Sequence, residues 1–494
     1  MNQHLTPYFT KLKMYANSER LQFDVPGHKL GKIENELTEA IGLSVFKYDV
    51  NGVDGLDNLN LPKGVIEESQ QLFAEAFHAD RAFFLTGRTT LGILAIIMTA
   101  AKAKEKVIMP RNVHKSIISS LIMSGAIPIF VEPQIDQDLG IANHMPYERL
   151  EAKIKEHPDA KAVLVINPTY FGVASDIKKI VELAHQYDMM VLADEAHGSH
   201  MVFSDQLPLT AMQAGADMSA TSIHKTSGSL TQSSAILTRG DRVSYRRLIS
   251  TIHLVQSTSP NALLLASLDV SRKYMYFNAE NRFNEILPEI RKIREKINLI
   301  QGIQAYGEEH FQSLGATKYD ETKMIIQVSE LGLTGFEAYR ILSREYGVQV
   351  ELAESNILLC VFTVATTKED LKGLYDALLK LSIHHKKEQL DIKTYRPKGH
   401  FPEAFVRPRS AYHAPSTYVD YDQAIDEIAA ESVMIYPPGI PILIPGEKIS
   451  QDLIESLKFY KSQGSTILNE APDGQIKIVD KETWPKWITI DDEL

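Results

Sequence analysis

Two stretches of the sequence carry side chains that could do chemistry. The first, "MVLADEAHGSHM", ends an apolar run with Asp194-Glu195-Ala196-His197 and then His200. The second, "SATSIHKTSGSLTQSS", places Lys225 in a run of hydroxyl residues and glycine. The first stretch alone is compatible with an ATP-driven helicase, with a metal site, or with a carboxylate that holds a charged heterocycle. The rest of the chain has to discriminate among these three.

The helicase and metal hypotheses each lack a required partner. A DEAH series works beside a phosphate-binding loop of the form G-x-x-x-x-G-K-[ST]. Lys115, Lys225 and Lys461 each precede a hydroxyl residue, but none has that glycine pattern upstream. A catalytic zinc site usually takes three protein ligands, and no third ligand is evident near His197 and His200. The sequence therefore predicts neither a helicase nor a bound metal.

The third hypothesis gains from the residues around Lys225. Ser222 and His224 come just before this lysine and can donate hydrogen bonds to a phosphate. An acid, a lysine and phosphate donors are what pyridoxal 5'-phosphate (PLP) requires. The lysine bonds covalently to the cofactor, the carboxylate keeps the pyridine nitrogen protonated, and the donors take the phosphate. Asp194, Lys225, Ser222 and His224 therefore predict a PLP site.

An alternation of short apolar strands and amphipathic helices must position these side chains. Such a pattern favours a mostly parallel sheet with helices on both faces, in which ligands bind beyond the carboxyl ends of the strands. The expected strands cover residues 82–87, 106–110, 127–132, 161–168, 189–196, 218–225 and 233–240. Downstream, residues 242–300 are expected to form long helices, and residues 320–385 a small α+β unit.

The residues after the other strands extend the prediction. Gly87-Arg88-Thr89-Thr90 is expected to be a tight turn at a helix N-terminus, where free N–H groups favour an anion. A purely structural strand-to-helix turn is the alternative. His114, in "PRNVHKS", either caps a helix or stacks on the face of the cofactor ring.

Composition limits the class of protein. The chain has 494 residues and a formal net charge of −11, which argues against nucleic acid or anionic lipid as partners. No apolar run of about 18 or more residues predicts a membrane span, and the N-terminus lacks the apolar core of a signal peptide. Cys360 is the only cysteine, so no intrachain disulfide can form. We expect a cytoplasmic protein.

At this point the sequence resembles the fold-type I PLP-dependent decarboxylases of ornithine, lysine and arginine. The matching pieces span nearly the whole chain in the family's order: "FDVPGHKLG", "PRNVHKS", "NPTYFGVASDI", "DEAHGSH", "SIHKTSGSLTQSS", "STSP" and "YPPGIPILIPGE". The lysine segment and the last segment are the most specific. The resemblance implies an aspartate aminotransferase-like large domain with a mostly parallel seven-stranded sheet, plus smaller α+β C-terminal domains.

The resemblance also implies domain boundaries. Residues 1–80 would form an N-terminal segment with dimerisation and active-site loops. Residues 81–300 would form the PLP-binding large domain and residues 301–385 a small α+β domain. Residues 386–494 would form a C-terminal decarboxylase domain.

Roles for single residues follow from the same resemblance. Lys225 would carry the cofactor, Asp194 would pair with its ring nitrogen, and His114 and Ala196 would pack against the two ring faces, with His197 close by. The phosphate would be bound by Gly87, Arg88, Thr89, Ser222 and His224. Ser257 and Thr258 would reach the phosphate of a neighbouring subunit, which implies a homodimer with shared sites. Substrate binding would fall to Thr169, Tyr170 and Glu447, with Glu447 reading the basic end of the substrate.

Two departures from the family stand out. The family usually has Asn-Gly-Ser/Thr-Thr/Ser in the first loop, whereas this chain has Thr86-Gly87-Arg88-Thr89. Arg88 either replaces a hydroxyl contact with a charged one, points away, or narrows the substrate entrance. The chain also lacks the N-terminal wing domain of the longer acid-inducible members. We therefore expect a dimer, or a small oligomer, with a biosynthetic role.

The expected reaction is the decarboxylation of a basic amino acid. Arginine is favoured, giving agmatine for polyamine synthesis, with lysine and ornithine as alternatives and a PLP-dependent aminotransferase or oxidase as more distant ones. Either Lys225 or His197 would return a proton to the substrate Cα.

Overall fold

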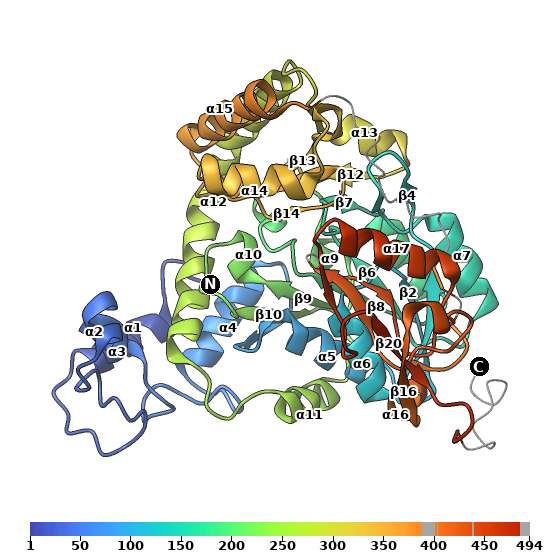
Figure 1. Ribbon diagram of the computed structural model, residues 1–494. Coiled ribbons are helices and arrows are strands. Elements are labelled where there is room, and N and C mark those ends of the chain that lie inside the picture. Colours follow the sequence, from blue (N-terminus) through green and yellow to red (C-terminus); the bar gives the residue numbers. More distant parts are fainter. Residues whose placement is uncertain (388–400, 403, 437–438, 485–494) are drawn as a thin grey trace. The chain divides into compact units, whose positions relative to one another are not determined.

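The computed structural model describes residues 1–387, 401–402, 404–436 and 439–484. The chain forms two compact units that interleave along the sequence, 1–99 with 192–283 and 100–191 with 284–494 (Figure 1). The division into four domains stays a prediction. Within the motif at 436–447, residues 437–438 lie outside the described residues.

Seven strands form the central sheet, and most of its neighbouring pairs are parallel. The order is β1 (Arg81–Leu85), β10 (Ser234–Thr238), β9 (Met218–Ser222), β8 (Met190–Glu195), β6 (Ala162–Ile166), β2 (Lys106–Pro110) and β3 (Ile127–Val131). The pairs β8–β9, β2–β6 and β2–β3 are parallel, whereas β10 is antiparallel to both of its neighbours. The mostly parallel seven-stranded sheet predicted from the sequence is confirmed.

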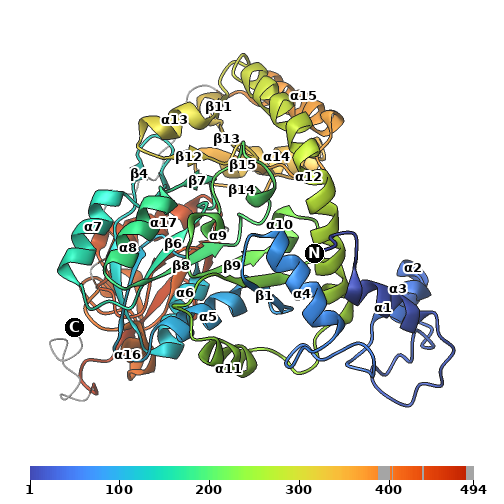
Figure 2. The ribbon, with the colours of Figure 1, turned by 180° about the vertical axis from the view of Figure 1, so that it is seen from behind.

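The first unit contains strands β1, β10 and β9 and most of β8. Helix α4 (Val65–Ala76) packs beside β1, as both Figure 1 and Figure 2 show. Helix α5 (Arg88–Ala100) begins directly after β1, as expected for a turn at a helix start. The long helices expected downstream are α11 (Tyr245–Val255) and α12 (Ala262–Ile297).

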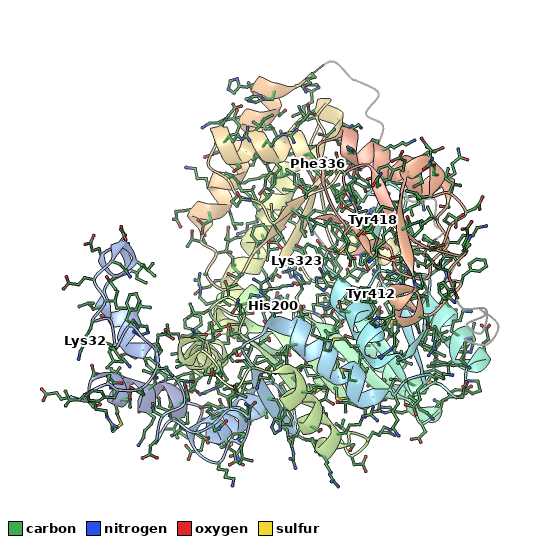
Figure 3. The ribbon with its side chains drawn as sticks, turned by 60° about the horizontal axis from the view of Figure 1, so that its bottom comes forward. Lys32, His200, Lys323, Phe336, Tyr412 and Tyr418 are labelled. Atoms are coloured by element: carbon green, nitrogen blue, oxygen red, sulfur yellow. The ribbon has the colours of Figure 1, made fainter. Side chains whose placement is uncertain are left out.

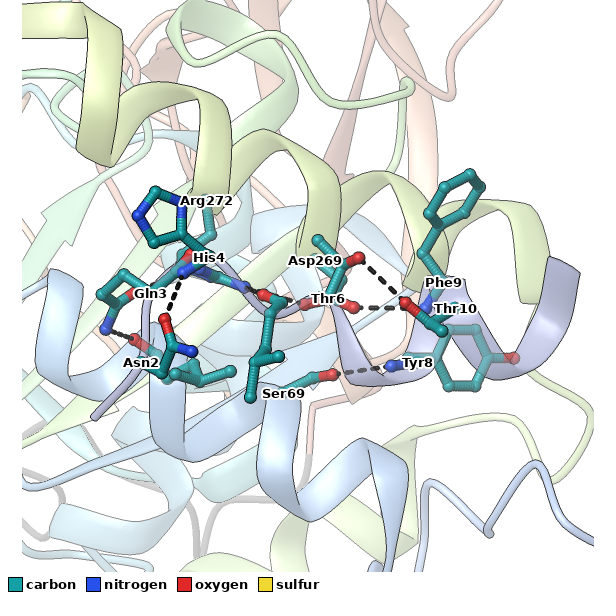
Figure 4. Close-up of polar contacts among 12 residues, drawn as sticks. Asn2, Gln3, His4, Thr6, Tyr8, Phe9, Thr10, Ser69, Asp269 and Arg272 are labelled. Carbon is teal, nitrogen blue, oxygen red and sulfur yellow. Dashed lines mark hydrogen bonds and ion pairs between the residues drawn. The ribbon is translucent and has the colours of Figure 1, made fainter.

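A buried polar network fastens the N-terminus to the first unit (Figure 4). Arg272 and Asp269 of α12 form an ion pair at 3.2 Å, and both side chains are fully buried. The Arg272 guanidinium also donates to the Gln3 carbonyl oxygen at 2.6 Å, and Asp269 accepts from the Phe9 backbone N–H at 3.1 Å. These bonds satisfy charges that would be costly to bury alone, and they hold α1 (Pro7–Ala16) in place.

The second unit contains strands β6, β2 and β3 and a smaller sheet. Helix α7 (Tyr147–Glu156) packs on β2 and β3, and α8 (Ile177–Gln186) packs on β6. The smaller sheet has the order β11 (Gln304–Tyr306), β13 (Lys323–Gln327), β15 (Ile357–Val361) and β14 (Leu352–Ala353). Helix α14 (Gly335–Glu345) packs on this sheet and on α15 (Lys368–His385) (Figure 1). Strands β13 and β15 and helices α14 and α15 fall within residues 320–385, where the sequence predicts a small α+β unit, and its standing as a separate domain stays a prediction.

The C-terminal part of the second unit has its own core, built around α17 (Gln451–Ser462). Its strands are β16 (Ser416–Asp420), β17 (Val433–Tyr436), β18 (Pro441–Leu443), β19 (Thr466–Leu468) and β20 (Gln475–Val479). The remaining elements are α2 (Glu36–Ile41), α3 (Leu43–Tyr48), α6 (Lys115–Ser124), β4 (Ile135–Asp136), β5 (Ile141–Ala142), β7 (Val173–Ala174), η1 (Met201–Phe203), α9 (Ala211–Ala214), α10 (Ile223–Thr226), α13 (Glu308–Ser313), β12 (Lys318–Tyr319), η2 (Ser329–Leu331), α16 (Pro408–His413) and η3 (Tyr421–Gln423).

Candidate active site

The two adjacent carboxylates at the end of β8 have different surroundings. Successive side chains on a strand point to opposite faces of the sheet, so Asp194 and Glu195 diverge. Glu195 is 3% exposed and accepts hydrogen bonds from the Ala211 N–H at 2.7 Å and the Ser219 hydroxyl at 2.6 Å. It therefore fastens β8 to β9 and to the start of α9. This structural role was not predicted from the sequence.

Asp194 is buried with few partners of its own. It is 6% exposed, and its Oδ1 accepts a hydrogen bond from the Ala196 N–H at 3.1 Å. Burial raises the pKa of this carboxyl group, while the Ala196 N–H and the nearby positive charge of Lys225 lower it. Within the part of the chain that the structure describes, Oδ2 accepts no hydrogen bond. A cationic partner would complete this environment.

Lys225 lies on a short helix and contacts a histidine of the DEAH stretch. Strand β9 ends at Ser222, and residues 223–226 form α10, so the expected strand over 218–225 is too long by three residues. The Lys225 Nζ lies 2.9 Å from the His197 Nε2. Beside them, the Ser199 hydroxyl lies 2.8 Å from both the Thr226 and the Ser227 hydroxyls. The two stretches that carry the chemistry are thus joined.

The loop after β1 lies beside the end of β9. Leu85 and Ser222 both pair with Ser234 of the intervening strand β10, which places the two strand ends at one edge. The Thr89 and Ser222 hydroxyls are hydrogen-bonded, and both side chains are buried. A Cβ at Gly87 would come within 2.7 Å of the end of the Leu91 side chain, so a larger residue here would require Leu91 to shift. The structure brings these predicted phosphate donors together.

Arg88 and His224 flank this pair of hydroxyls. The Arg88 backbone has a positive φ of 64° and its N–H donates to the Gln232 carbonyl oxygen at 2.9 Å, while its side chain is exposed. Burial lowers the pKa of His224, and the positive charges of Lys225 and Arg88 lower it further, against a hydrogen bond to the Ser233 carbonyl oxygen. The positive charge of Arg88 therefore acts on His224, which is one of the predicted phosphate donors.

Ser257 and Thr258 are exposed in the turn between α11 and α12. The Ser257 hydroxyl accepts from the Ser259 N–H at 3.1 Å, which shapes this turn. Their exposure is compatible with contact to a second chain, and their role at a neighbouring phosphate stays a prediction. Ala196 is half-buried, and its packing against the cofactor ring also stays a prediction.

The other predicted site residues belong to the second unit. His114 is the N-cap of α6, where its Nδ1 accepts from the Ser116 N–H at 3.1 Å, and its side chain is exposed. Thr169 is buried, and its hydroxyl accepts from the Val173 N–H at 3.1 Å. The Tyr170 hydroxyl donates to Glu351 at 2.5 Å. His114 thus caps a helix, and its stacking on a cofactor ring stays a prediction.

Glu447 forms a buried ion pair with Arg111, for which the sequence predicts no role. The Arg111 Nε and Nη2 each donate to one Glu447 oxygen at 2.7 Å, and both side chains are at most 1% exposed. Arg111 also donates to the Pro441 carbonyl oxygen at 2.9 Å, and Glu447 accepts from the Ile444 N–H at 2.9 Å. This bidentate pair joins residues 336 positions apart, and local sequence patterns carry no sign of it.

Comparison with known proteins identifies the family. Residues 6–370 match the family model for the Orn/Lys/Arg decarboxylase major domain, and residues 389–467 match the model for the C-terminal domain of the same family. The chain belongs to the Orn/Lys/Arg decarboxylase family. The resemblance inferred from the sequence is confirmed, and the family and its fold imply PLP-dependent chemistry.

Relatives of this decarboxylase cover nearly its whole length. It is similar to an arginine decarboxylase of Bacillus subtilis, with 43% identity over 92% of this chain and 93% of that protein. An arginine decarboxylase of Halalkalibacterium halodurans is 42% identical, over 95% and 96% of the two chains. The crystal structure of a Francisella novicida lysine decarboxylase has a TM-score of 0.82 at 19% identity, covering 96% of this chain and 81% of that one. The similarity to that structure supports the fold that the sequence predicts for this chain.

The buried pair of this decarboxylase leads to a stability prediction. Replacing Glu447 by alanine should lower the free energy of unfolding by about 3–5 kcal/mol, because the Arg111 charge would stay buried without its partner. Urea unfolding of the variant measures this change. Glu295→Ala is the matched control, since Glu295 is exposed on α12. A raised KM for the substrate with unchanged stability would instead favour the predicted role of Glu447 at the substrate.

Among the described residues, no three His, Cys, Asp or Glu side chains gather in a way that could hold a metal ion. His200 is fully buried and lies 5.8 Å from the Phe283 ring, measured between centroids. No helix in the described ranges is long and apolar enough to cross a membrane.

Proposed function

We propose that this chain is a PLP-dependent arginine decarboxylase that converts L-arginine to agmatine and carbon dioxide, in polyamine biosynthesis. The choice of arginine is supported by four similar proteins named arginine decarboxylase, which share 40–43% identity with the chain. Proteins named lysine decarboxylase are more distant, at 22–23% identity. A cytoplasmic location stays a prediction from the sequence.

The observation that carries the proposal is the grouping of Lys225, His197 and Asp194. The residues fit PLP, because a lysine amine, a buried carboxylate with a raised pKa and a set of phosphate donors all lie in one unit. When bound, PLP would supply an electron sink for the pair of electrons left when the Cα–carboxylate bond breaks. A cationic ring nitrogen would add to the positive charge of Lys225 as a counter-charge for the buried Asp194.

The protein's own groups would handle the proton. The 2.9 Å contact between the Lys225 Nζ and the His197 Nε2 lets one proton be held between two nitrogen atoms. Once carbon dioxide leaves, a proton must reach the substrate Cα, and this pair is placed to deliver it. His197 is only 8% exposed, so its own contact with bulk water is small, whereas Lys225 is exposed. Whether Lys225 or His197 makes the final transfer stays open.

Substrate choice is tested by product analysis. The purified protein, loaded with PLP, is given L-arginine, L-lysine and L-ornithine separately, and carbon dioxide and the amine product are followed. We expect carbon dioxide and agmatine in equal amounts from arginine, with little product from the other two. Cadaverine or putrescine as the main product would support decarboxylase activity but contradict arginine as the preferred substrate. A keto acid without carbon dioxide would indicate an aminotransferase.

Arg88 is proposed to bind the cofactor phosphate. Replacing Arg88 by serine restores the family-like hydroxyl and removes the charge that acts on His224. We expect PLP to bind about tenfold to a hundredfold more weakly, the usual loss for one charge-assisted hydrogen bond. Equilibrium titration of the apoprotein with PLP measures this affinity, and Arg246→Ser, at an exposed position of α11, is the control. An unchanged dissociation constant would remove Arg88 from the phosphate site.

We also propose a homodimer with shared active sites. The segment between α1 and α4 loops out from the rest of the first unit in Figures 1 and 2, and Lys32 on it is labelled in Figure 3. Phe23 is 92% exposed and Leu21 is 83% exposed on this segment, more than an apolar side chain of a monomer usually is. A second copy of the chain would cover them and would bring Ser257 and Thr258 to its phosphate. Sedimentation equilibrium should give twice the chain mass.

A further inference from the structure

A pocket on helix α14, in the second unit, has no part in the proposed chemistry. Its volume is about 340 Å³, near the lower end for small-molecule sites. One wall is a single face of α14, made by Glu337, Arg340, Ile341, Arg344 and Glu345, which recur at helical spacing. The side chain of Phe336, labelled in Figure 3, instead packs against the core around α17.

At each of the two ends of this face a carboxylate contacts a nitrogen atom. Lys387 lies 2.8 Å from Glu337, and His385 lies 3.1 Å from Glu345. Each carboxylate of the pocket thereby already has a nitrogen partner. What remains at the centre of the face is the pair of arginines.

Arg340 and Arg344 are exposed, and in the described part of the chain neither guanidinium has a hydrogen-bond or ion-pair partner. Like charges four residues apart on a helix repel each other, so the pair is unfavourable by itself. Beside the two arginines, the buried Leu333 and the half-buried Ile341 form an apolar part of the pocket wall. Two guanidinium groups next to each other can bind two carboxylate or phosphate groups bidentately.

We propose that this pocket binds a small anion with two or more negative groups, carboxylate or phosphate. The ligand would lie between the Lys387–Glu337 and His385–Glu345 contacts and would supply the counter-charge for Arg340 and Arg344. The inference does not rest on the decarboxylase proposal, and it can be tested in the absence of the amino acid substrate.

Isothermal titration of the PLP-loaded protein at low salt provides the test, with citrate in one series and pyrophosphate in the other. We expect saturable binding of at least one probe, weakened more than tenfold in R340Q/R344Q. The control R246Q/K372Q removes the same charge from exposed positions outside the pocket and should bind as the wild type does. Binding of citrate alone assigns carboxylate ligands, and binding of pyrophosphate alone assigns phosphate ligands.

Two results would overturn the proposal. One is no binding of either anion by the wild type, and the other is equal binding by the wild type and R340Q/R344Q. Circular dichroism checks that the double variant folds. If it does not fold, the single variants R340Q and R344Q take its place, and the same two results apply to them.

Discussion

Replacing Lys225 by alanine is expected to abolish decarboxylation and the visible absorbance of the lysine-bound cofactor. The rate constant should fall more than about a thousandfold, because the residue that carries PLP and one partner of the shared proton are lost together. A second effect is expected at His197, because the Lys225 Nζ lies 2.9 Å from its Nε2. Without Lys225, His197 loses its nitrogen partner at that distance.

The measurements are an absorbance spectrum before and after borohydride, together with agmatine formation. Lys102→Ala is the matched control, since Lys102 is an exposed lysine outside the site, and it should leave both unchanged. A Lys225→Ala protein with the spectrum and rate of the wild type would refute the assignment. The unfolding transition of the variant separates loss of chemistry from loss of structure.

Replacing Asp194 by asparagine is expected to slow the reaction about a hundredfold to a thousandfold while the protein stays folded. The amide has the same shape but no charge, so it cannot hold a proton on the ring nitrogen of the cofactor, and a preorganised charge of this kind is typically worth that much in rate. The raised pKa of Asp194 reflects burial, which the Ala196 N–H and the Lys225 charge offset only in part and a further cationic partner would offset more. The rate constant with saturating PLP and arginine measures the effect.

The neighbouring residue offers an internal control. Glu195→Gln changes the adjacent carboxylate, which accepts from the Ala211 N–H and the Ser219 hydroxyl and points to the other face of the sheet. This variant should lose about 1–3 kcal/mol of stability and keep most of its activity. Near-normal activity of Asp194→Asn would mean that another acid holds the ring. Equal rate losses in both variants would contradict the division of roles between the two carboxylates.

The sequence by itself determined the class of the sheet, seven mostly parallel strands, and the family. Short apolar strands with turns and polar residues after them place Asp194, Ser222 and the Gly87–Thr89 loop at one edge, because parallel strands end on the same side. The register of β8, β9 and β10 confirms this arrangement. The motif series was also specific enough to name the Orn/Lys/Arg decarboxylases, which the family match confirms.

Tertiary structure decided what periodicity leaves open. Alternation along a strand separates Asp194 from Glu195 but cannot say which one faces the site, since that depends on what packs against each face. The Arg111–Glu447 pair joins positions 336 residues apart, and the pocket of α14 depends on how the end of α15 packs beside it. Local patterns follow from the backbone geometry of a few neighbouring residues. Partners distant in sequence are fixed only when burial requires each buried charge to find its counterpart.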